Sequence, residues 1–128
     1  MPKYLLDTNI LIYYLNGDET AIEFVDKNID KCAMSIISYL EVLVYPYDEE
    51  EEKIVRDFLN LFRVYAVEMD IVNSAITAYR SKKINTADNL IGSTAKSRGL
   101  TLVTRNVADF RAMALEILDP YAKRDEEL

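Results

Sequence analysis

The sequence contains no histidine and no tryptophan, and it has one cysteine, three glycines and three prolines in 128 residues. The lack of histidine excludes Ser-His-Asp and Cys-His catalysis, histidine-based metal sites and a histidine general base. The single cysteine, Cys32, excludes an internal disulfide and is typical of proteins of a reducing cytoplasm. Carboxylates must therefore carry any chemistry that this chain performs.

Long hydrophobic runs are lacking as well. No apolar run approaches the roughly 18–20 residues that span a bilayer. The first residues, Met1 to Tyr4, lead directly into a predicted strand, so no signal peptide is expected. Half of the residues are apolar, which is enough to form one core in a chain of this length. We therefore expect one cytoplasmic domain, 1–128, with a tail that frays from about residue 121.

Positive charge is scarce overall but concentrated in one segment. The net charge is −7, yet residues 80–111 carry seven Lys and Arg against two acids, and the rest carries eight against twenty. Such asymmetry is typical of a region that faces phosphates, although a solvated surface can produce the same pattern. The seven basic residues are Arg80, Lys82, Lys83, Lys96, Arg98, Arg105 and Arg111.

Apolar segments that suit strands alternate with segments that suit helices. Strands are predicted at 3–6, 31–35, 62–67, 100–104 and 115–118. Helices are predicted from 7 or 8 to about 16, at 19–28, from 35 or 38 to 44, and at 48–60, 69–82 and 87–98, with a turn or short helix at 106–111. This order predicts a single α/β domain whose parallel sheet is covered on both faces. The helix that ends at residue 44 is apolar nearly all round, so we expect it to be buried.

Four acids stand in structured or apolar surroundings: Asp7, Glu41, Asp88 and Asp109. Each has a purely structural interpretation. Asp7 suits a helix N-cap, Glu41 could reach solvent along one helix edge, and Asp88 and Asp109 each follow an asparagine at capping-box spacing. However, strand ends and helix starts of a doubly wound sheet lie on one side of the molecule, so the four carboxylates could converge.

Converging carboxylates would need a cation. At ~4 Å two like charges repel by about 4 kcal/mol even at an effective dielectric near 20. A set of oxygen ligands without histidine or cysteine favours Mg²⁺ or Mn²⁺. Such sites serve phosphoryl transfer to an activated water. The basic segment would then face a nucleic-acid backbone.

Four segments of the sequence resemble the signature segments of PIN domains, and more narrowly those of VapC-type ribonuclease toxins from prokaryotic toxin–antitoxin pairs. They are Tyr4–Ile12, Ser38–Val42, Ala87–Ala95 and Leu102–Phe110, in the order of that family. The resemblance implies a three-layer α/β/α sandwich around a mostly parallel sheet of about five strands. It also implies an Mg²⁺- or Mn²⁺-dependent endoribonuclease that forms homodimers and is silenced by a cognate antitoxin covering or reaching into the site.

Carried over by position, the resemblance makes the four acids the catalytic and metal-binding set. These are Asp7, Glu41, Asp88 and Asp109, with Thr104 and Asn106 as polar supports and Asn9 orienting Asp7. One departure is Asn89, because small or apolar residues are more usual after the third acid. Another is the lack of an extra acid before the last segment. A metal-activated water would leave a 5′-phosphate on the product, since the ribose 2′-hydroxyl does not attack.

Three other interpretations stay open at this point. One is a catalytically silent interaction domain whose acids only cap helices, and another is a PIN nuclease of RNA processing without a toxin role. The third, an aspartyl-nucleophile phosphatase, needs an acid where this chain has Asn9. The nine tyrosines, which include Tyr13, Tyr14, Tyr45 and Tyr47, exceed what a core needs and so hint at a dimer interface, although such residues more often line the edge of the core.

Overall fold

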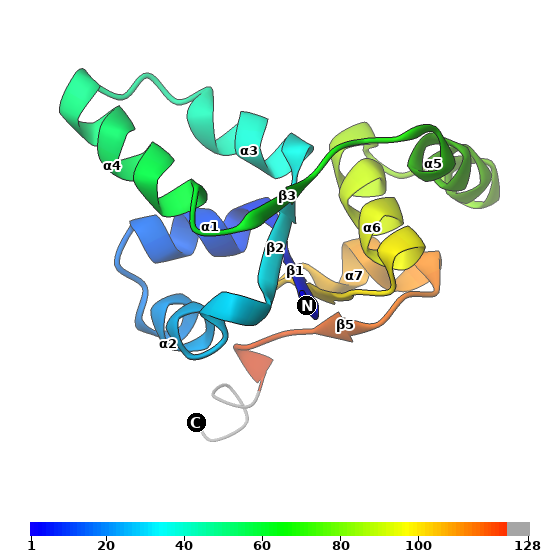
Figure 1. Ribbon diagram of the computed structural model, residues 1–128. Coiled ribbons are helices and arrows are strands. Elements are labelled where there is room, and N and C mark those ends of the chain that lie inside the picture. Colours follow the sequence, from blue (N-terminus) through cyan, green and yellow to red (C-terminus); the bar gives the residue numbers. More distant parts are fainter. Residues whose placement is uncertain (123–128) are drawn as a thin grey trace.

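The computed structural model describes residues 1–122, which form one five-stranded sheet with helices on both faces (Figure 1). The strands are β1 (Tyr4–Leu6), β2 (Cys32–Ser35), β3 (Arg63–Tyr65), β4 (Thr101–Val103) and β5 (Ile117–Leu118). Their order is β3-β2-β1-β4-β5, and every neighbouring pair is parallel. The predicted α/β/α sandwich with a parallel sheet of about five strands is confirmed.

The helices lie in two groups, with α1 to α4 on one side of the strands and α5 to α7 on the other (Figure 1). None of the helices within residues 1–122 is long and apolar enough to cross a membrane. Their bounds are α1 (Thr8–Leu15), α2 (Glu19–Lys27), α3 (Ile36–Leu43), α4 (Glu49–Leu59), α5 (Met69–Ser81), α6 (Thr86–Arg98) and α7 (Val107–Phe110).

Two apolar cores lie on the two faces of the sheet. Successive strand residues point to opposite faces, so Leu6 packs with Ile10 and Phe58 in one core while Leu5 packs with Ile91 in the other. Both leucines are fully buried. The short, largely apolar strands are therefore those of a sheet covered on both faces.

The order of the strands reverses between β1 and β4. The chain runs from β1 through β2 to β3 on one side, then crosses back to place β4 and β5 on the other. In open parallel sheets, ligands bind outside the carboxyl ends of the strands at such a reversal. Asp7 and Thr104 are the first residues after β1 and β4, so both lie at this point.

Helix caps resolve the alternative starts that the sequence left open. Asp7 is the N-cap of α1, Ser35 caps α3, and Asn85 caps α6. Gly99 ends α6 with a φ of +66°, a left-handed conformation that glycine adopts without strain. The predicted strand at 62–67 is shorter in the structure, because its neighbour β2 gives way to α3 after Ser35.

The expectation that α3 would be buried is wrong. Only Ser38 and Val42 of this helix are buried, whereas Ile36, Leu40 and Val44 are 40%, 58% and 67% exposed. These three residues are spaced four apart and therefore share one face. The helix contacts α1, α4 and α6. An apolar sequence alone does not reveal that one of its faces remains exposed.

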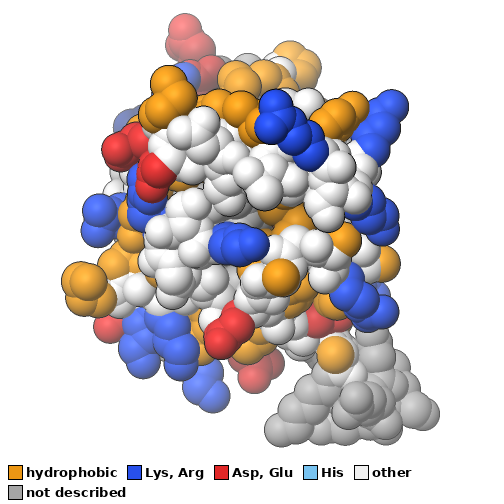
Figure 2. Space-filling model, turned by 90° about the vertical axis from the view of Figure 1, so that its right-hand side faces the viewer, with side chains coloured by type: hydrophobic (Ala, Val, Ile, Leu, Met, Phe, Trp, Pro, Cys, Tyr) orange, Lys and Arg blue, Asp and Glu red, His pale blue; other side chains and the backbone are white. Residues whose placement is uncertain are grey.

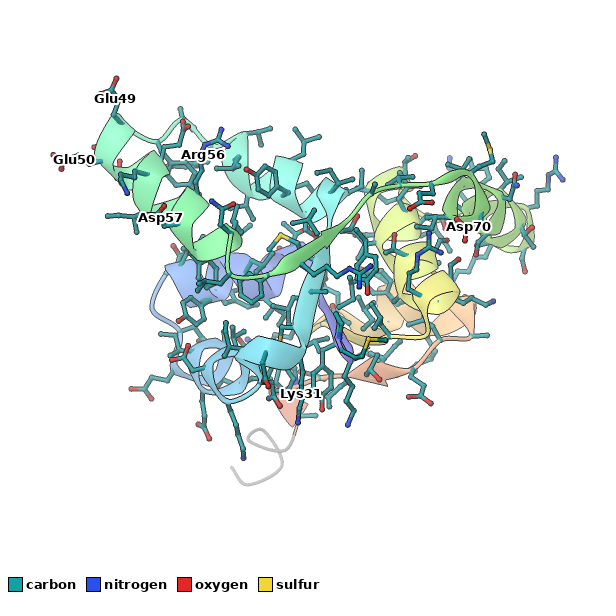
Figure 3. The ribbon with its side chains drawn as sticks, in the orientation of Figure 1. Lys31, Glu49, Glu50, Arg56, Asp57 and Asp70 are labelled. Carbon is teal, nitrogen blue, oxygen red and sulfur yellow. The ribbon has the colours of Figure 1, made fainter. Side chains whose placement is uncertain are left out.

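The acidic run that opens α4 is a solvated helix start, as its position predicts. Asp48 and Glu51 form a reciprocal capping box, with Asp48 Oδ1 accepting the Glu51 N–H at 2.8 Å. Glu49 and Glu50 point away from the rest of the molecule (Figure 3). At the other end of the described chain, Tyr121 is buried in the core, and residues 123–128 of the predicted frayed tail lie outside the described residues.

Candidate functional site

Asp7 and Thr104 form the centre of the site. Leu6 pairs in register with Val103, so the residues that follow them lie side by side at the strand reversal. Thr104 Oγ1 donates to Asp7 Oδ2 at 2.8 Å, and the Thr8 N–H donates to Asp7 Oδ1 at 2.8 Å. Each carboxylate oxygen therefore accepts one hydrogen bond and keeps a lone pair for another ligand. Asp7 caps its helix and is also available to the site.

Asp7 is a buried acid, with only 3% of its surface exposed. The pKa of Asp7 is raised from the ordinary 3.8 to about 6, and burial is the largest cause of this rise. The hydrogen bonds from Thr104 and Thr8 lower the pKa, whereas the charges of Asp88 and Glu41 raise it further. A charged group in this position lacks the stabilisation that water would give it. A positive charge beside the Asp7 carboxylate would therefore stabilise its ionised form.

Glu41 is held by a pair of buried hydroxyls. Thr8 Oγ1 lies 2.6 Å from Glu41 Oε1 and 2.9 Å from Ser38 Oγ. Because a carboxylate only accepts, Thr8 donates its one proton to Glu41, and Ser38 donates to Thr8. Glu41 itself is exposed, so it reaches solvent along one edge of its helix, which is one of the interpretations that the sequence left open.

Thr8 and Ser38 are site residues that the sequence interpretation did not single out. Their signals were nevertheless present, because Thr8 directly follows Asp7 and Ser38 precedes Glu41 by three residues. Residues three apart on a helix share a face, so Ser38 and Glu41 approach α1 together. A buried hydroxyl beside an acid is a support that only the packing of α1 against α3 makes visible.

Asp88 lies in the first turn of α6 and is half-buried. Burial raises the pKa of its carboxyl, and the charges of Asp109 and Glu41 raise it further. Asn85 Oδ1 accepts the Asp88 N–H at 3.2 Å, which caps the helix. Within the described chain the Asp88 carboxylate does not return the bond that would complete a capping box. Its charge therefore remains available to the site.

Asp109 and Asn106 lie on the segment that follows β4, and both are exposed. The Asn106 N–H donates to Thr104 Oγ1 at 3.0 Å, so Asn106 supports the Thr104 hydroxyl through its backbone. The charge of Asp109 acts on Asp88 across the gap between α7 and α6. The segment after β4 is thus linked to Asp7 through the Thr104 hydroxyl and to Asp88 through the charge of Asp109.

The four acids occupy one region without forming a tight cluster. Asp7 interacts electrostatically with Asp88 and Glu41, and Asp88 does so with Asp109 and Glu41. Among residues 1–122, no three His, Cys, Asp or Glu side chains are placed to hold one metal ion between them. Asn9 is half-buried, and the hydrogen bonds on Asp7 come from Thr8 and Thr104, so an orienting role for Asn9 stays a prediction.

The donor chemistry of this region fits a hard divalent cation. Every candidate ligand atom is a carboxylate oxygen, and in the described part of the chain the ion pairs of Lys and Arg involve other acids. Mg²⁺ usually keeps several waters and takes only one or two carboxylates together with substrate phosphates. Acids spaced as pairs are suited to that mode of binding, and a cation would offset the burial and repulsion that raise the pKa of Asp7 and Asp88.

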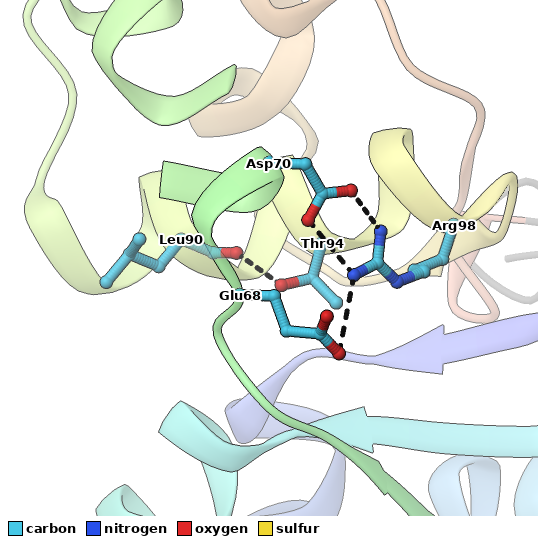
Figure 4. Close-up of polar contacts among 5 residues, drawn as sticks. All are labelled: Glu68, Asp70, Leu90, Thr94 and Arg98. Carbon is cyan, nitrogen blue, oxygen red and sulfur yellow. Dashed lines mark hydrogen bonds and ion pairs between the residues drawn. The ribbon is translucent and has the colours of Figure 1, made fainter. Parts of the chain in front are cut away.

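The basic segment is less available to a ligand than its composition suggests. Arg98 binds Asp70 at 2.6 Å and lies 3.8 Å from Glu68, so one of the seven basic residues is already paired (Figure 4). Exposed cations remain at Arg80, Lys82 and Lys83 where α5 leads into α6. Lys and Arg groups are spread over the face on the α5 and α6 side, and acids form only small groups there (Figure 2).

A groove of about 600 Å³ adjoins the site between α1, α3 and α4. Ile12 and Leu15 of α1, Val44 beyond α3 and Ile54 of α4 contribute apolar surface to it, and Glu41 lies in its lining. Val44 and Ile54 are each 67% exposed. The groove thus links an unpartnered apolar surface to one of the four site acids.

Comparison with known proteins identifies the family. The model of the PIN domain matches residues 4–116, which takes in the four acids and both hydroxyl supports. The chain belongs to the PIN-domain family. The strand reversal that brings Asp7 to Thr104 therefore lies within the matched domain.

Curated relatives are similar over nearly the whole chain. The Ribonuclease VapC2 of Haemophilus influenzae is 30% identical, over 90% of this chain and 96% of that protein. A tRNA(fMet)-specific endonuclease VapC from Salmonella typhimurium is also 30% identical, over 86% of this chain and 91% of its own length. These names describe nucleases that act on RNA.

Solved structures share the fold. A toxin-antitoxin complex from Klebsiella pneumoniae contains a chain with a TM-score of 0.84 and 29% identity, covering 93% of this chain and 98% of that one. The DNA-bound VapBC of Salmonella typhimurium gives the same TM-score at 24% identity, over 94% of this chain and 99% of that one. The PIN fold and the VapC-type resemblance predicted from the sequence are both confirmed.

Proposed function

We propose that this PIN domain is a metal-dependent endoribonuclease that acts as the cytoplasmic toxin of a toxin–antitoxin pair. The observation that carries the proposal is the buried Asp7, hydrogen-bonded to Thr104 at the strand reversal and acted on by the charges of Asp88 and Glu41. The relatives named as VapC ribonucleases support the choice of RNA as substrate.

In this proposal the four acids hold the cation, and the hydroxyls hold the acids. Thr104 and the Thr8 N–H fix Asp7, the Thr8 hydroxyl fixes Glu41, and the Asn85 cap fixes the first turn of α6 beneath Asp88. Mg²⁺ or Mn²⁺, when bound, would supply a water of lowered pKa and polarise the phosphate. An ionised carboxylate of the set takes the proton, since histidine is lacking.

The exposed bases near α6 are the proposed contacts for the RNA backbone. Lys82 and Lys83 lie on the loop that leads into α6, six and five residues before Asp88, respectively. Cations in that position would neutralise phosphates on either side of the one that is cleaved. The overall charge of −7 means that this local attraction works against the field of the rest of the molecule.

The groove beside Glu41 is the proposed seat of the antitoxin. Two observations support this occupant: the apolar lining at Ile12, Leu15 and Ile54, and the structural likeness to chains in toxin–antitoxin complexes. A partner segment that fills the groove would end next to an acid of the site. Coverage of Glu41 would exclude RNA, which is the inhibition expected of an antitoxin.

A second copy of this chain is the proposed partner for the exposed face of α3 at Ile36 and Leu40. The four tyrosines give this proposal partial support only. Tyr13 and Tyr14 pack against Tyr121 and Phe58 at the edge of the core, and they are used within the fold. Leu40→Asp should yield a monomer by sedimentation analysis, whereas Ile54→Asp in the groove should leave the dimer intact. An unchanged mass for Leu40→Asp would exclude this dimer face.

The catalytic proposal is tested by incubating the purified protein with RNA and Mn²⁺ and mapping the ends of the products. We expect cleavage with 5′-phosphate ends, abolished by EDTA and by Asp7→Asn, while Asp57→Asn on α4 cleaves as the wild type does. Products ending in 2′,3′-cyclic phosphate would refute attack by water. Cleavage retained by Asp7→Asn would remove Asp7 from the site.

A further inference from the structure

Asn89 is a buried amide between α5 and α6. It is 4% exposed, its Nδ2 donates to the Ala75 carbonyl of α5 at 2.8 Å, and its Oδ1 accepts from the Ser93 hydroxyl at 3.2 Å. Both polar ends of the side chain therefore have partners, which is the condition under which an amide is tolerated in a core.

An apolar side chain could fill the same space. Leucine has the same number and branching of side-chain heavy atoms as asparagine, although its two methyl groups make it larger, and it would bury surface between the helices without a directional contact. A hydrogen bond to one carbonyl, by contrast, selects one rotation and one axial position of α6 relative to Ala75. Buried polar groups are known to set the register of helices in this way. The Asn89 amide thus contributes more to the position of α6 relative to α5 than to the apolar packing between the two helices.

The other polar link between these helices lies at the far end of α6. There Arg98 pairs with Asp70 and Glu68, whose side chains are largely exposed (Figure 4). Exposed ion pairs hold geometry weakly. Thr94 donates to the Leu90 carbonyl of its own helix, so it does not join α6 to α5. Near the first turn of α6, the buried link is that of Asn89.

We propose that Asn89 is a positioning residue for Asp88, because its bond to Ala75 fixes the first turn of α6 where Asp88 faces Glu41 and Asp109. Asp88 is the adjacent residue, and a small rotation of α6 would move its carboxylate relative to the other acids. The Asn85 cap orders the turn internally but does not join it to α5. This inference rests on the proposed function, since it assigns Asn89 a role toward the cation held by Asp88.

The test compares Asn89→Leu with wild type and with Asn73→Leu, the same change at an exposed position of α5. Three quantities are measured: the melting temperature without metal, the dissociation constant for Mn²⁺ alone, and amide hydrogen exchange in residues 86–90. For Asn89→Leu we expect a lower melting temperature than wild type, because the buried Ser93 hydroxyl loses its acceptor. At a temperature where the variant is folded, we expect about tenfold weaker Mn²⁺ binding and faster exchange in the first turn of α6. Asn73→Leu should match wild type in all three.

Wild-type Mn²⁺ affinity in Asn89→Leu would overturn the proposal and leave Asn89 a packing residue. An equal loss in Asn73→Leu would overturn it as well. If Asn89→Leu does not fold, Asn89→Ala is used instead, at a temperature where circular dichroism shows that it is folded. Wild-type Mn²⁺ affinity in Asn89→Ala would then overturn the proposal. Asp88→Asn separates the two proposals. If Asp88→Asn binds Mn²⁺ normally, the proposed metal site is wrong. If Asp88→Asn loses Mn²⁺ binding while Asn89→Leu binds Mn²⁺ normally, only the positioning role of Asn89 is contradicted.

Discussion

Thr104 donates a hydrogen bond of 2.8 Å to Asp7, although 97 positions separate the two residues in the chain. The contact exists because β1 and β4 are neighbours at the reversal of strand order. The same carboxylate receives the Thr8 N–H at the start of α1. One acid is thus fixed both by its own helix and by a distant strand, which suits a group that must keep its orientation while a ligand binds.

Thr104→Val tests the importance of that contact. The change leaves Asp7 Oδ2 without its donor, and an unpaired buried polar atom costs about 1–3 kcal/mol. The pKa of Asp7 should rise above about 6, because the Thr104 hydroxyl now lowers it. Cleavage of RNA should fall, while Thr101→Val at the start of β4 should have little effect. Carbon-detected NMR titration of Asp7 and a cleavage assay measure the two effects; an unchanged pKa would contradict this role of Thr104.

The stability of the metal-free protein should depend on pH through Asp7. Its pKa is about 6 when folded and 3.8 ordinarily, so the folded state binds more protons between these values. Lowering the pH from 7 towards 4 should therefore stabilise the folded state by up to about 3 kcal/mol from this group. Above pH 6 the full cost of burying the charge remains.

Asp7→Asn isolates this contribution. Denaturant unfolding in EDTA, repeated across this pH range, gives the difference between wild type and variant at each pH. The variant should be relatively more stable at pH 7 than at pH 4. A difference that does not change with pH would show that burial does not raise the pKa of Asp7.

Thr8→Val should reduce cleavage by about 10- to 100-fold, the usual effect of losing a support of a metal-binding group. The variant removes the 2.6 Å hydrogen bond to Glu41 and leaves the Thr8 backbone bond to Asp7. Ser38→Ala is the matched control, because it removes only the hydroxyl behind Thr8. It should be the milder of the two. Equal activity of Thr8→Val and wild type would exclude a role for the orientation of Glu41.

Mn²⁺ should raise the melting temperature of the wild type. Binding to the folded state at a concentration 100 times the dissociation constant adds about 2.7 kcal/mol. Asp7→Asn and Asp88→Asn should lose most of this gain, whereas Asp57→Asn, which removes an exposed acid of α4, should keep it. Differential scanning fluorimetry with and without metal measures the effect. A gain that all three variants share would point to binding elsewhere on the acidic surface.

Much of the fold was predictable because its causes are local. Apolar runs of strand length alternate with helical patterns, Gly99 ends α6, and Asp48 with Glu51 begins α4. The position of Asp7 after β1 was equally readable. What could not be read was the exposure of α3, because an apolar helix has the same sequence whether or not each face meets a partner.

The sequence identified the four acids of the candidate site as a set, and the structure showed that they differ in burial. Asp7 is buried, Asp88 is half-buried, and Glu41 and Asp109 are exposed. Local sequence does not determine these exposures, since each depends on which element packs over the residue. The supports Thr8 and Ser38 were missed for the same reason, because their bonds join α1 to α3.

The sequence by itself determined the α/β class, the candidate residues for the helix caps and the four segments that assign the chain to the PIN domains, since these depend on periodicity and on residue types at short spacing. Only the tertiary structure decided that β4 lies beside β1, that Thr104 meets Asp7, that Arg98 is paired with Asp70, and that Asn89 joins α6 to α5. These contacts link residues far apart in the chain. Their geometry follows from strand order and helix packing, to which every element of the fold contributes.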